Sequence, residues 1–320
     1  MRPLKIASVL FAFILCVSEI AGQQSVQWTQ HMLAPYTYNP GYAGLDRSLS
    51  VTAGVRSQWS QFGDAPITQM VQAHLPLYII SGAAGIALTN DQLGVFRRTS
   101  VSLSYNYVLD SPIGLISTGL RLGGQQVRLD ANRIRTPDGF YADNVIDHND
   151  PRLTEVPLEG IAPIWGIGMF LSQEFLDVGL SVDNFSSAEA GASGFNEHLL
   201  FTVYGAYQLP LTEILAIEPN ILVKTDGAQT QLDIGVLGHY NQFLAGLSLR
   251  GYNSDSLDAI GVIAGLRVNS HVRVSYSFDL GLSGLRSFHD GTHEFIFNYN
   301  LNKPIRTGEL PRIIYNPRFN

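Results

Sequence analysis

Strict alternation of apolar and polar residues is the feature that most constrains how this chain can fold. Residues 100–109 read SVSLSYNYVL and residues 271–280 read HVRVSYSFDL. In both segments the apolar or aromatic side chains recur at every second position, which places them on one face of an extended strand. A helix would scatter the intervening polar side chains around its axis. The pattern therefore predicts β-strands with one apolar and one wet face.

The same alternation, followed along the whole sequence, predicts about fourteen strands. Their ranges are 48–59, 65–76, 80–89, 98–109, 113–129, 163–173, 176–185, 198–209, 214–225, 230–239, 243–253, 258–268, 271–282 and 291–301. The pattern is weakest at 113–129 and at 214–225, where Pro219 interrupts it. An even number of strands, each of about 9–11 residues, is typical of bacterial outer-membrane barrels. We therefore expect an all-β fold, a single-chain antiparallel transmembrane β-barrel of the outer-membrane type.

The lengths of the connections alternate along this strand order. The second, fourth, sixth, eighth, tenth and twelfth connections are short, whereas the longest ones, 130–162, 186–197 and 283–290, fall on odd connections. Bacterial barrels place short turns in the periplasm and long loops outside the cell. The parity therefore predicts that both ends of the barrel sequence lie in the periplasm and that 130–162 is a large outer loop or a plug.

The first 22 residues have the composition of a secretory signal peptide. Arg2 and Lys5 precede an apolar run, and Ala21 and Gly22 supply the small residues of a cleavage site. We expect four parts: the signal peptide at 1–22, a periplasmic or lumenal N-terminal segment at 23–47, the barrel at 48–301 and a periplasmic tail at 302–320. Cys16 is the only cysteine and lies in the leader, so the cleaved chain would have no disulfide and no thiolate site.

Several classes of function find no support in the sequence. The formal net charge of -7 argues against a nucleic-acid partner, because binding to phosphates needs a basic patch. The chain has no GxSxG, P-loop or HExxH motif, and Gly166-Ile167-Gly168 lacks the third glycine of a dinucleotide loop. We therefore expect neither enzymatic activity nor a cofactor.

Residues 138–152 concentrate oxygen-bearing side chains, of which Asp143, Asp147 and Asp150 are weak candidates for a metal site. Calcium accepts such ligands, but their spacing does not match a twelve-residue helix–loop–helix site. A polar surface loop or plug is the favoured interpretation, and we expect no bound metal.

A set of motifs, in order along the chain, resembles one family of membrane proteins. Residues 28–44, WTQHMLAPYTYNPGYAG, are similar to a pattern that ends in YNPAYAG, with Gly41 in place of the usual alanine. Residues 56–77, RSQWSQFGDAPITQMVQAHLPL, resemble R-x-QW followed by GAP-x-TQ and HxPL, with Asp64 inserted after Gly63. NDPRL at 149–153, GLSVDNF at 179–185 and HEFIFNY at 293–299 follow. The chain thus resembles the PorP/SprF family of the type IX secretion system of Bacteroidota.

This resemblance implies an outer-membrane barrel that takes part in type IX secretion and gliding motility. It implies docking of periplasmic ring proteins (PorK/PorN-like) and peptidoglycan-linked components, or assistance to a secreted adhesin of SprB type or its C-terminal domain. Outer-membrane lipids would surround the barrel. The alternative is a passive outer-membrane channel for small polar solutes, and a barrel enzyme with a serine, histidine and acid inside the lumen is more remote.

Two sets of residues carry these expectations. The N-terminal segment would act as a plug or a docking element through Trp28, Gln30, Met32, Pro35, Tyr38, Asn39, Pro40, Tyr42 and Gly44. The family motifs on the first hairpin and the last strand comprise Arg56, Gln58, Trp59, Gly63, Ala65, Pro66, Thr68, Gln69, His74, Pro76, His293 and Glu294. The family has no assigned catalytic residues, so the resemblance implies none here.

Overall fold

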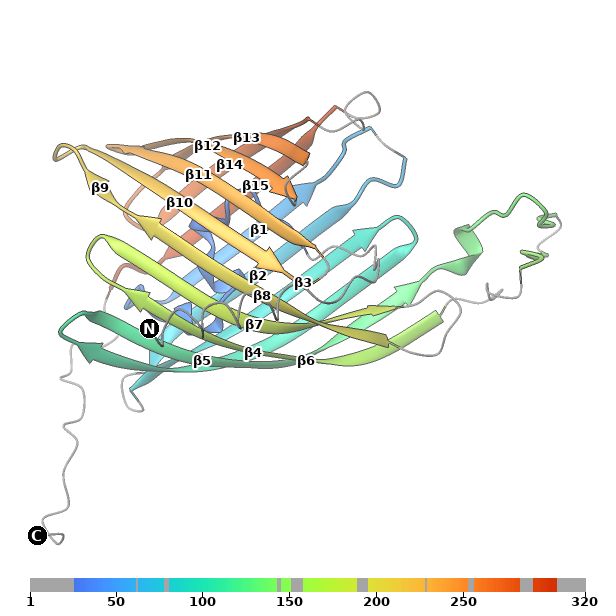
Figure 1. Cartoon of the computed structure of the whole chain (residues 1–320), viewed down its shortest axis with the longest axis horizontal. Coiled ribbons are helices and arrows are strands. Elements are labelled where there is room, and N and C mark those ends of the chain that lie inside the picture. Colours follow the sequence, from blue (N-terminus) through green and yellow to red (C-terminus); the bar gives the residue numbers. More distant parts are fainter. Residues whose placement is uncertain are drawn as a thin grey trace, which may run out of the picture.

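The computed structural model describes residues 26–61, 63–77, 81–142, 145–150, 158–188, 195–227, 229–252, 256–282 and 290–303. Within these ranges the chain forms fourteen long strands and one two-residue strand (Figure 1). The strands are β1 (Ser50–Ser57), β2 (Ile67–Leu77), β3 (Gly82–Leu93), β4 (Phe96–Ser111), β5 (Gly114–Leu129), β6 (Leu158–Ser172), β7 (Leu176–Ala188), β8 (Phe195–Tyr207), β9 (Leu209–Pro210), β10 (Leu215–Thr225), β11 (Thr230–Tyr240), β12 (Phe243–Tyr252), β13 (Ser256–Arg267), β14 (Val272–Gly281) and β15 (Thr292–Asn300).

The long strands form one closed antiparallel barrel. Each pairs with its neighbour in sequence, β10 pairs with both β8 and β11, and β1 pairs with β15 as well as β2. The β1–β15 seam runs from Ser50 opposite Asn300 to Ser57 opposite His293. Closure removes the unpaired edges that a flat sheet would leave. The prediction of a single-chain antiparallel barrel of about fourteen strands is confirmed.

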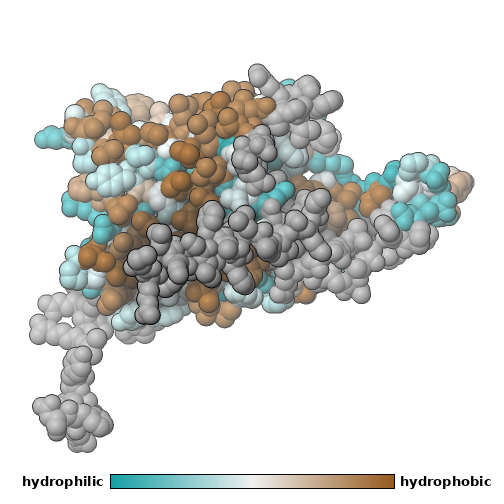
Figure 2. All heavy atoms as spheres, in the orientation of Figure 1, coloured by the Kyte–Doolittle hydropathy of each residue, from teal (hydrophilic) through white to brown (hydrophobic). Residues whose placement is uncertain are grey.

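The barrel is apolar outside and polar inside. Along β4, Val101 and Leu103 point outward and are 46% and 61% exposed, whereas Ser102 and Ser104 point inward and are each 7% exposed. Apolar residues spread over the outer surface that faces the viewer in Figure 2. This is the reverse of a water-soluble barrel, and it suits a surface surrounded by lipid. Among the described residues, no helix has the length and apolar character needed to cross a membrane.

Most strand ends differ from the predicted bounds by a few residues, and two of these differences have a clear structural cause. The connection expected at 130–162 is shorter, because β6 already begins at Leu158, which pairs with Leu129. The strand expected at 198–209 is interrupted at Gln208, after which Leu209 and Pro210 form β9. Pro219 lies at this interruption: β10 pairs with β9 up to Ile217 and with β8 from Asn220. The missing N–H of proline is tolerated there because that side of the strand changes partner.

The long connection between β5 and β6 extends beyond the end of the barrel (Figure 1). Its described part contains an isolated bridge between Phe140 and Asp147 and an ion pair from Arg133 to Asp64 of the first hairpin. The barrel therefore has a long-loop end, to which this connection belongs, and a short-turn end, to which the β4–β5, β11–β12 and β13–β14 turns belong. The described residues of this loop lie outside the lumen.

Candidate functional site

The chain that precedes β1 folds inside the barrel (Figure 1). Residues 26–49, here called the lumenal segment, contain three short 3₁₀ turns: η1 (His31–Leu33), η2 (Pro35–Thr37) and η3 (Pro40–Tyr42). Pro35 and Pro40 occupy the first positions of their turns, where a missing N–H costs nothing and the fixed φ is favourable. The segment is thus locally specified by its prolines and is surrounded by the inner faces of the strands.

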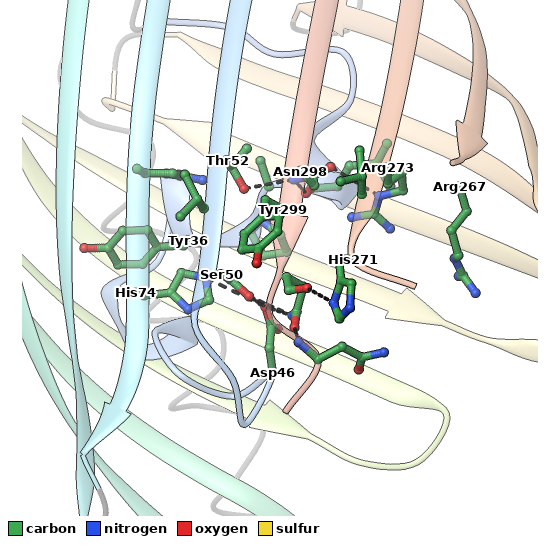
Figure 3. A pocket seen from close by; sticks show the side chains of 18 of the residues that line it. Tyr36, Asp46, Ser50, Thr52, His74, Arg267, His271, Arg273, Asn298 and Tyr299 are labelled. Atoms are coloured by element: carbon green, nitrogen blue, oxygen red, sulfur yellow. Dashed lines mark hydrogen bonds and ion pairs between the residues drawn. The ribbon is translucent and has the colours of Figure 1, made fainter. Parts of the chain in front are cut away.

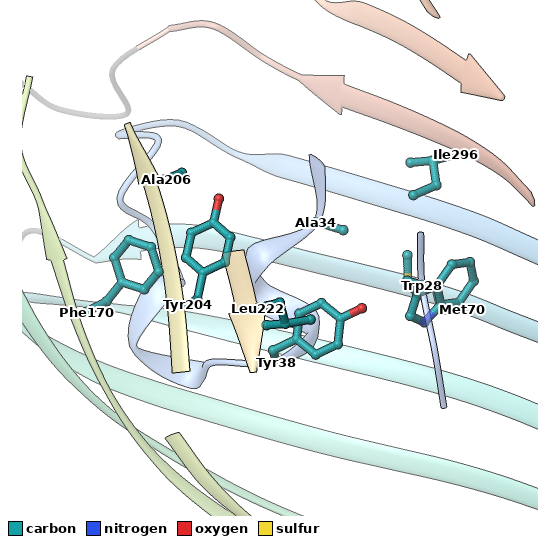
Figure 4. Close-up of a cluster of buried hydrophobic side chains, with 9 residues drawn as sticks. All are labelled: Trp28, Ala34, Tyr38, Met70, Phe170, Tyr204, Ala206, Leu222 and Ile296. Atoms are coloured by element: carbon teal, nitrogen blue, oxygen red, sulfur yellow. The ribbon is translucent and has the colours of Figure 1, made fainter. Parts of the chain in front are cut away.

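Aromatic packing anchors the segment at its centre. Trp28 and Tyr38 lie in an apolar cluster with wall residues from several strands (Figure 4). The wall residues are Met70, Phe170, Tyr204, Ala206, Leu222 and Ile296. Trp28 is 1% exposed. Full burial of an aromatic side chain of this size stabilises the fold by about 1.5–3 kcal/mol or more. The lumen therefore has an apolar core that exists only when the segment occupies it.

A buried hydroxyl group joins the segment to a network of charges on the wall. Thr29 Oγ1 donates to Asp279 Oδ2 over 2.6 Å and accepts from Arg56 Nη1 at 2.9 Å and Arg250 Nη2 at 3.1 Å. Arg56 also pairs with Asp279 and Glu294, each at 2.9 Å. The hydroxyl thus uses its one donor and both acceptor positions. One threonine of the segment contacts side chains from β1, β12 and β14.

Glu294 of β15 binds the backbone of the segment directly. Its two carboxylate oxygens accept from the N–H groups of Thr29, at 2.8 Å, and Gln30, at 2.9 Å. Hydrogen bonds to a charged acceptor are stronger than neutral ones. Because Glu294 recognises N–H groups rather than a side chain, it fixes the path of the backbone as well as its charge environment.

The network is balanced in charge. Arg250 Nε pairs with Asp233 Oδ1 at 2.8 Å, and Lys224 Nζ donates to the carbonyl of Val26 at 3.0 Å and interacts electrostatically with Asp233. Together with Arg56, Asp279 and Glu294 this gives three cations and three carboxylates, all of them buried. Buried charges are tolerated only when paired and hydrogen-bonded. The segment supplies four of the groups that complete this pairing: the Thr29 hydroxyl, the N–H groups of Thr29 and Gln30, and the Val26 carbonyl.

A second attachment lies at η3, against β4 to β7. Asn39 Nδ2 donates to the carbonyls of Met169, at 2.9 Å, and Leu180, at 3.0 Å. Asn106 Nδ2 lies 3.0 Å from the Gly41 carbonyl and 2.7 Å from the Ala43 carbonyl. The wall and the segment therefore satisfy each other's backbone groups, as buried polar groups require.

Arginine 121 makes a third attachment, at η2. Its Nη2 donates to the Tyr36 carbonyl at 2.6 Å and its Nη1 to the Thr37 carbonyl at 3.2 Å, and it pairs with Asp183 at 3.4 Å. The Tyr36 hydroxyl and Ser104 Oγ are 2.8 Å apart. The last carbonyls of a turn have no partner within it, and here a charged side chain of the wall supplies one.

His31 is the one imidazole of the segment, and it is fully buried. Its ring packs edge-on against Tyr204, with 6.2 Å between centroids. Burial lowers the pKa of His31 to about 4, because a charged ring would lose its hydration. The ring is therefore neutral at pH 7 and acts as packing between the segment and β8.

Glycines in the strands provide the space that η3 occupies. A methyl group at Gly119 of β5 would fall 2.6 Å from the Pro40 carbonyl carbon and oxygen, and one at Gly168 of β6 would fall 2.0 Å from Asn39 Oδ1. These contacts explain why glycine occupies positions 119 and 168 within strands. The missing side chains of Gly119 and Gly168 leave room for η3 against the barrel wall.

We expect Gly119→Ala to destabilise the protein by about 1–3 kcal/mol, because overpacking forces rigid backbone atoms apart. Gly124→Ala on the same strand is the matched control, since the nearest atom to its new methyl group would be 3.9 Å away, and we expect a change within about 0.5 kcal/mol. Thermal unfolding in detergent, with protease digestion of the lumenal segment, measures both. Equal stability and equal protease sensitivity of the two variants would show that Gly119 does not make room for the lumenal segment.

The structure places the nine residues expected in a plug or docking element inside the barrel. Most of them are buried, and Tyr42 and Pro35 are partly so. Of the motif residues on the first hairpin and last strand, Arg56, Thr68, His74 and Glu294 point into the lumen, and Arg56 meets Glu294. Pro66 and Pro76 are also buried. Gln69 and His293 face outward, and Gln58, Trp59, Gly63 and Ala65 belong to the β1–β2 connection.

Other residues of the site were not anticipated. Thr29, Asn106, Arg121, Asp233, Arg250 and Asp279 all contribute, and except for Thr29 each lies on the polar face of a strand. The sequence feature that could identify the five strand residues is a charged or amide side chain on the polar face of a strand. Among the described residues there is no group of three histidines or acids that could hold a metal ion; Asp147 and Asp150 are on the outer loop, and Asp143 lies outside the described ranges.

A closed barrel with an apolar outer surface, a polar inner wall and a filled lumen defines an outer-membrane β-barrel protein. The family described as "Type IX secretion system membrane protein PorP/SprF" matches residues 20–299. The chain therefore belongs to the PorP/SprF family, as its motifs predicted. No curated protein sequence matches the chain.

Several solved structures have a similar shape. The Acinetobacter baumannii outer membrane protein Omp33 has a TM-score of 0.47 and 8% identity, over 79% of this chain and 97% of that one. A mutant of Rh. blastica porin has a TM-score of 0.36 and 10% identity, over 79% and 98%. A mutant of the monoaromatic hydrocarbon channel TodX has a TM-score of 0.43 and 9% identity, over 80% and 89%. The fold assignment for this chain rests on its own strand pairing.

Proposed function

We propose that this PorP/SprF barrel serves type IX secretion and gliding as a plugged docking component of the outer membrane, rather than as an enzyme or an open pore. The observation that carries the proposal is the lumenal segment, which occupies the barrel and is bonded to wall strands on several sides. A barrel whose lumen is filled by its own chain offers its two ends, rather than its interior, to other molecules.

The alternative function, passive passage of small polar solutes, needs a continuous wet path through the lumen. Here the polar side chains at the centre of the wall are engaged by the segment: Arg56 and Glu294 bind Thr29, and Arg121 binds the Tyr36 carbonyl. Trp28 and Tyr38 add apolar packing at the same level. These contacts support docking over conduction.

The two ends suit different partners. We expect the short-turn end to face the periplasm and to meet the ring proteins of PorK/PorN type and peptidoglycan-linked components. The long-loop end exposes Phe140 and Val145, at 58% and 51%, and we expect it to meet a secreted adhesin of SprB type or its C-terminal domain. Lipids of the outer membrane cover the apolar belt between them.

Site-specific photo-cross-linking in native outer membranes tests the proposal. A cross-linker at Gln242, on the exposed β11–β12 turn, should capture periplasmic secretion proteins, and one at Phe140 should capture a secreted surface protein. Leu103, exposed in the middle of the apolar belt, is the matched control and should capture neither. Recovery of no protein from Gln242 and Phe140, together with steady solute conductance of the purified barrel, would contradict docking and support the channel.

A further inference from the structure

A polar cavity of about 530 Å³ lies at the short-turn end of the barrel (Figure 3). Tyr36, Tyr42 and Asp46 of the lumenal segment form one side of it, and inward-facing residues of β13, β14, β15, β1 and β2 form the other. Residues 269–271 of the β13–β14 turn line its mouth. The cavity therefore opens toward the end that we expect to face the periplasm.

Two arginines face each other on its wall. Arg267 of β13 is the direct partner of Arg273 of β14 in the strand register, and both line the cavity. Like charges directly opposite on neighbouring strands destabilise a sheet. Within the part of the chain that the structure describes, neither arginine has a carboxylate within 4.0 Å, and the only side-chain bond of the pair runs from Arg273 Nε to Asn298 Oδ1, at 3.2 Å. The terminal nitrogens of both guanidinium groups remain available to a ligand.

The acid of the cavity, Asp46, acts electrostatically on Arg273 but makes its hydrogen bonds with other residues. Asp46 accepts from the Tyr42 hydroxyl at 2.8 Å and from Asn300 Nδ2 at 3.4 Å, and also from the Ser50 hydroxyl. His74 Nε2 lies 3.9 Å from it. Among the residues that line the cavity, the two guanidinium groups and one carboxylate give a net charge of about +1 when the histidines are neutral; Glu218, outside this lining, also acts electrostatically on Arg273. That charge is matched by a monoanion rather than by a dianion.

We propose that Arg267 and Arg273 bind the carboxylate group of a ligand that enters the cavity from the short-turn end. The planar, forked donors of arginine match a carboxylate in geometry as well as in charge. Asn298 and Asn300 also line the cavity. Their amide N–H groups already donate to Thr52 and Ser50, but the second lone pair of each amide oxygen can accept from a peptide N–H next to the carboxylate. The ligand is a small free carboxylate or the carboxylate end of a peptide. The site is independent of the docking function proposed above.

Isothermal titration calorimetry on the detergent-purified full chain tests the site with N-acetylglycine, N-acetyl-tetraglycine, their C-terminal amides and inorganic phosphate. We expect both acids to bind, and both amides to bind at least about tenfold more weakly, the factor expected for losing a charge-assisted hydrogen bond. Tighter binding of the tetraglycine acid would support the site and identify a peptide as the source. Equal binding of the two acids would support it and identify a small carboxylate.

Variants of the two arginines provide a second test of the site. The double variant Arg267→Gln with Arg273→Gln should weaken binding of the acids at least about tenfold, and each single variant should weaken it less. Arg97→Gln is the matched control, because Arg97 is also paired with an arginine, Arg128, but on an outward face at the long-loop end; it should leave binding unchanged. Heat-modifiable migration on gels confirms that each variant is folded. Binding of amides or phosphate as tight as that of the acids, absence of binding by the acids, or an unaffected double variant would each overturn the proposal.

Discussion

Arg56→Met should lower the free energy of unfolding by about 3–5 kcal/mol, the range for breaking a buried ion pair by removing one partner. The variant leaves Glu294 without its 2.9 Å ion pair and deprives Asp279 and the Thr29 hydroxyl of a donor. All of these groups are buried, so water cannot replace the lost bonds. Urea or thermal unfolding in detergent, followed by heat-modifiable migration, measures the loss.

The control for this prediction is an arginine of the same barrel whose ion pair is open to solvent. Arg128 pairs with Glu159 at 3.0 Å, with the two side chains 48% and 44% exposed, and Arg128→Met should cost only about 0–1 kcal/mol. Adding Glu294→Gln to Arg56→Met removes the orphaned charge and should recover part of the stability. If Arg56→Met costs no more than Arg128→Met, the network does not hold the segment.

Deletion of residues 27–43 should turn the barrel into a steadily conducting pore. The deleted residues include Trp28, Thr29 and the three 3₁₀ turns, so the apolar cluster and the charged network both lose their central partners. The inner wall that remains is polar and becomes wet. We expect the single-channel conductance of the deletion variant in planar bilayers to exceed that of the full chain at least about tenfold, as an open lumen of this size conducts and a filled one does not.

A deletion of equal length in the outer loop, residues 134–150, is the control and should leave the conductance at the level of the full chain. The same two variants separate plugging from docking in native membranes. Loss of the periplasmic partners only on deletion of 27–43 would assign docking as well as plugging to the lumenal segment. A full chain that conducts as well as its deletion variant would refute the plug.

The barrel architecture could be predicted from the sequence because the alternation within each strand shows which side chains face outward and which face the lumen. In residues 100–109 each side chain reports its own face, so the apolar outer surface and polar inner surface of β4 follow from alternation alone. Strand ends were harder to predict where pairing with a neighbouring strand, rather than the local sequence, fixes them. Leu158 belongs to β6 because Leu129 is opposite to it, and Gln208 interrupts a strand because β10 changes partner near Pro219.

The site was only partly predictable, for a physical reason. Trp28, Asn39 and Glu294 belong to recognisable motifs, but the contact between Thr29 and Glu294 joins positions 265 residues apart. No local pattern encodes such a contact. Asp279 and Arg250 are recognisable in the sequence as charges on inner faces, but the group of the lumenal segment that both contact is the hydroxyl of Thr29, in a stretch with no strand pattern.

The position of the charged network has a consequence for assembly. Thr29 and Arg56 belong to the start of the chain, whereas Asp279 and Glu294 belong to its last two strands, and they meet across the seam where β15 joins β1. Contacts of such long range form late, since most of the chain must be in place before they can close. Residues 26–49 must therefore stay inside an open sheet until β15 pairs with β1. Pairing of β15 with β1 and formation of the contacts that hold the lumenal segment then occur in a single step.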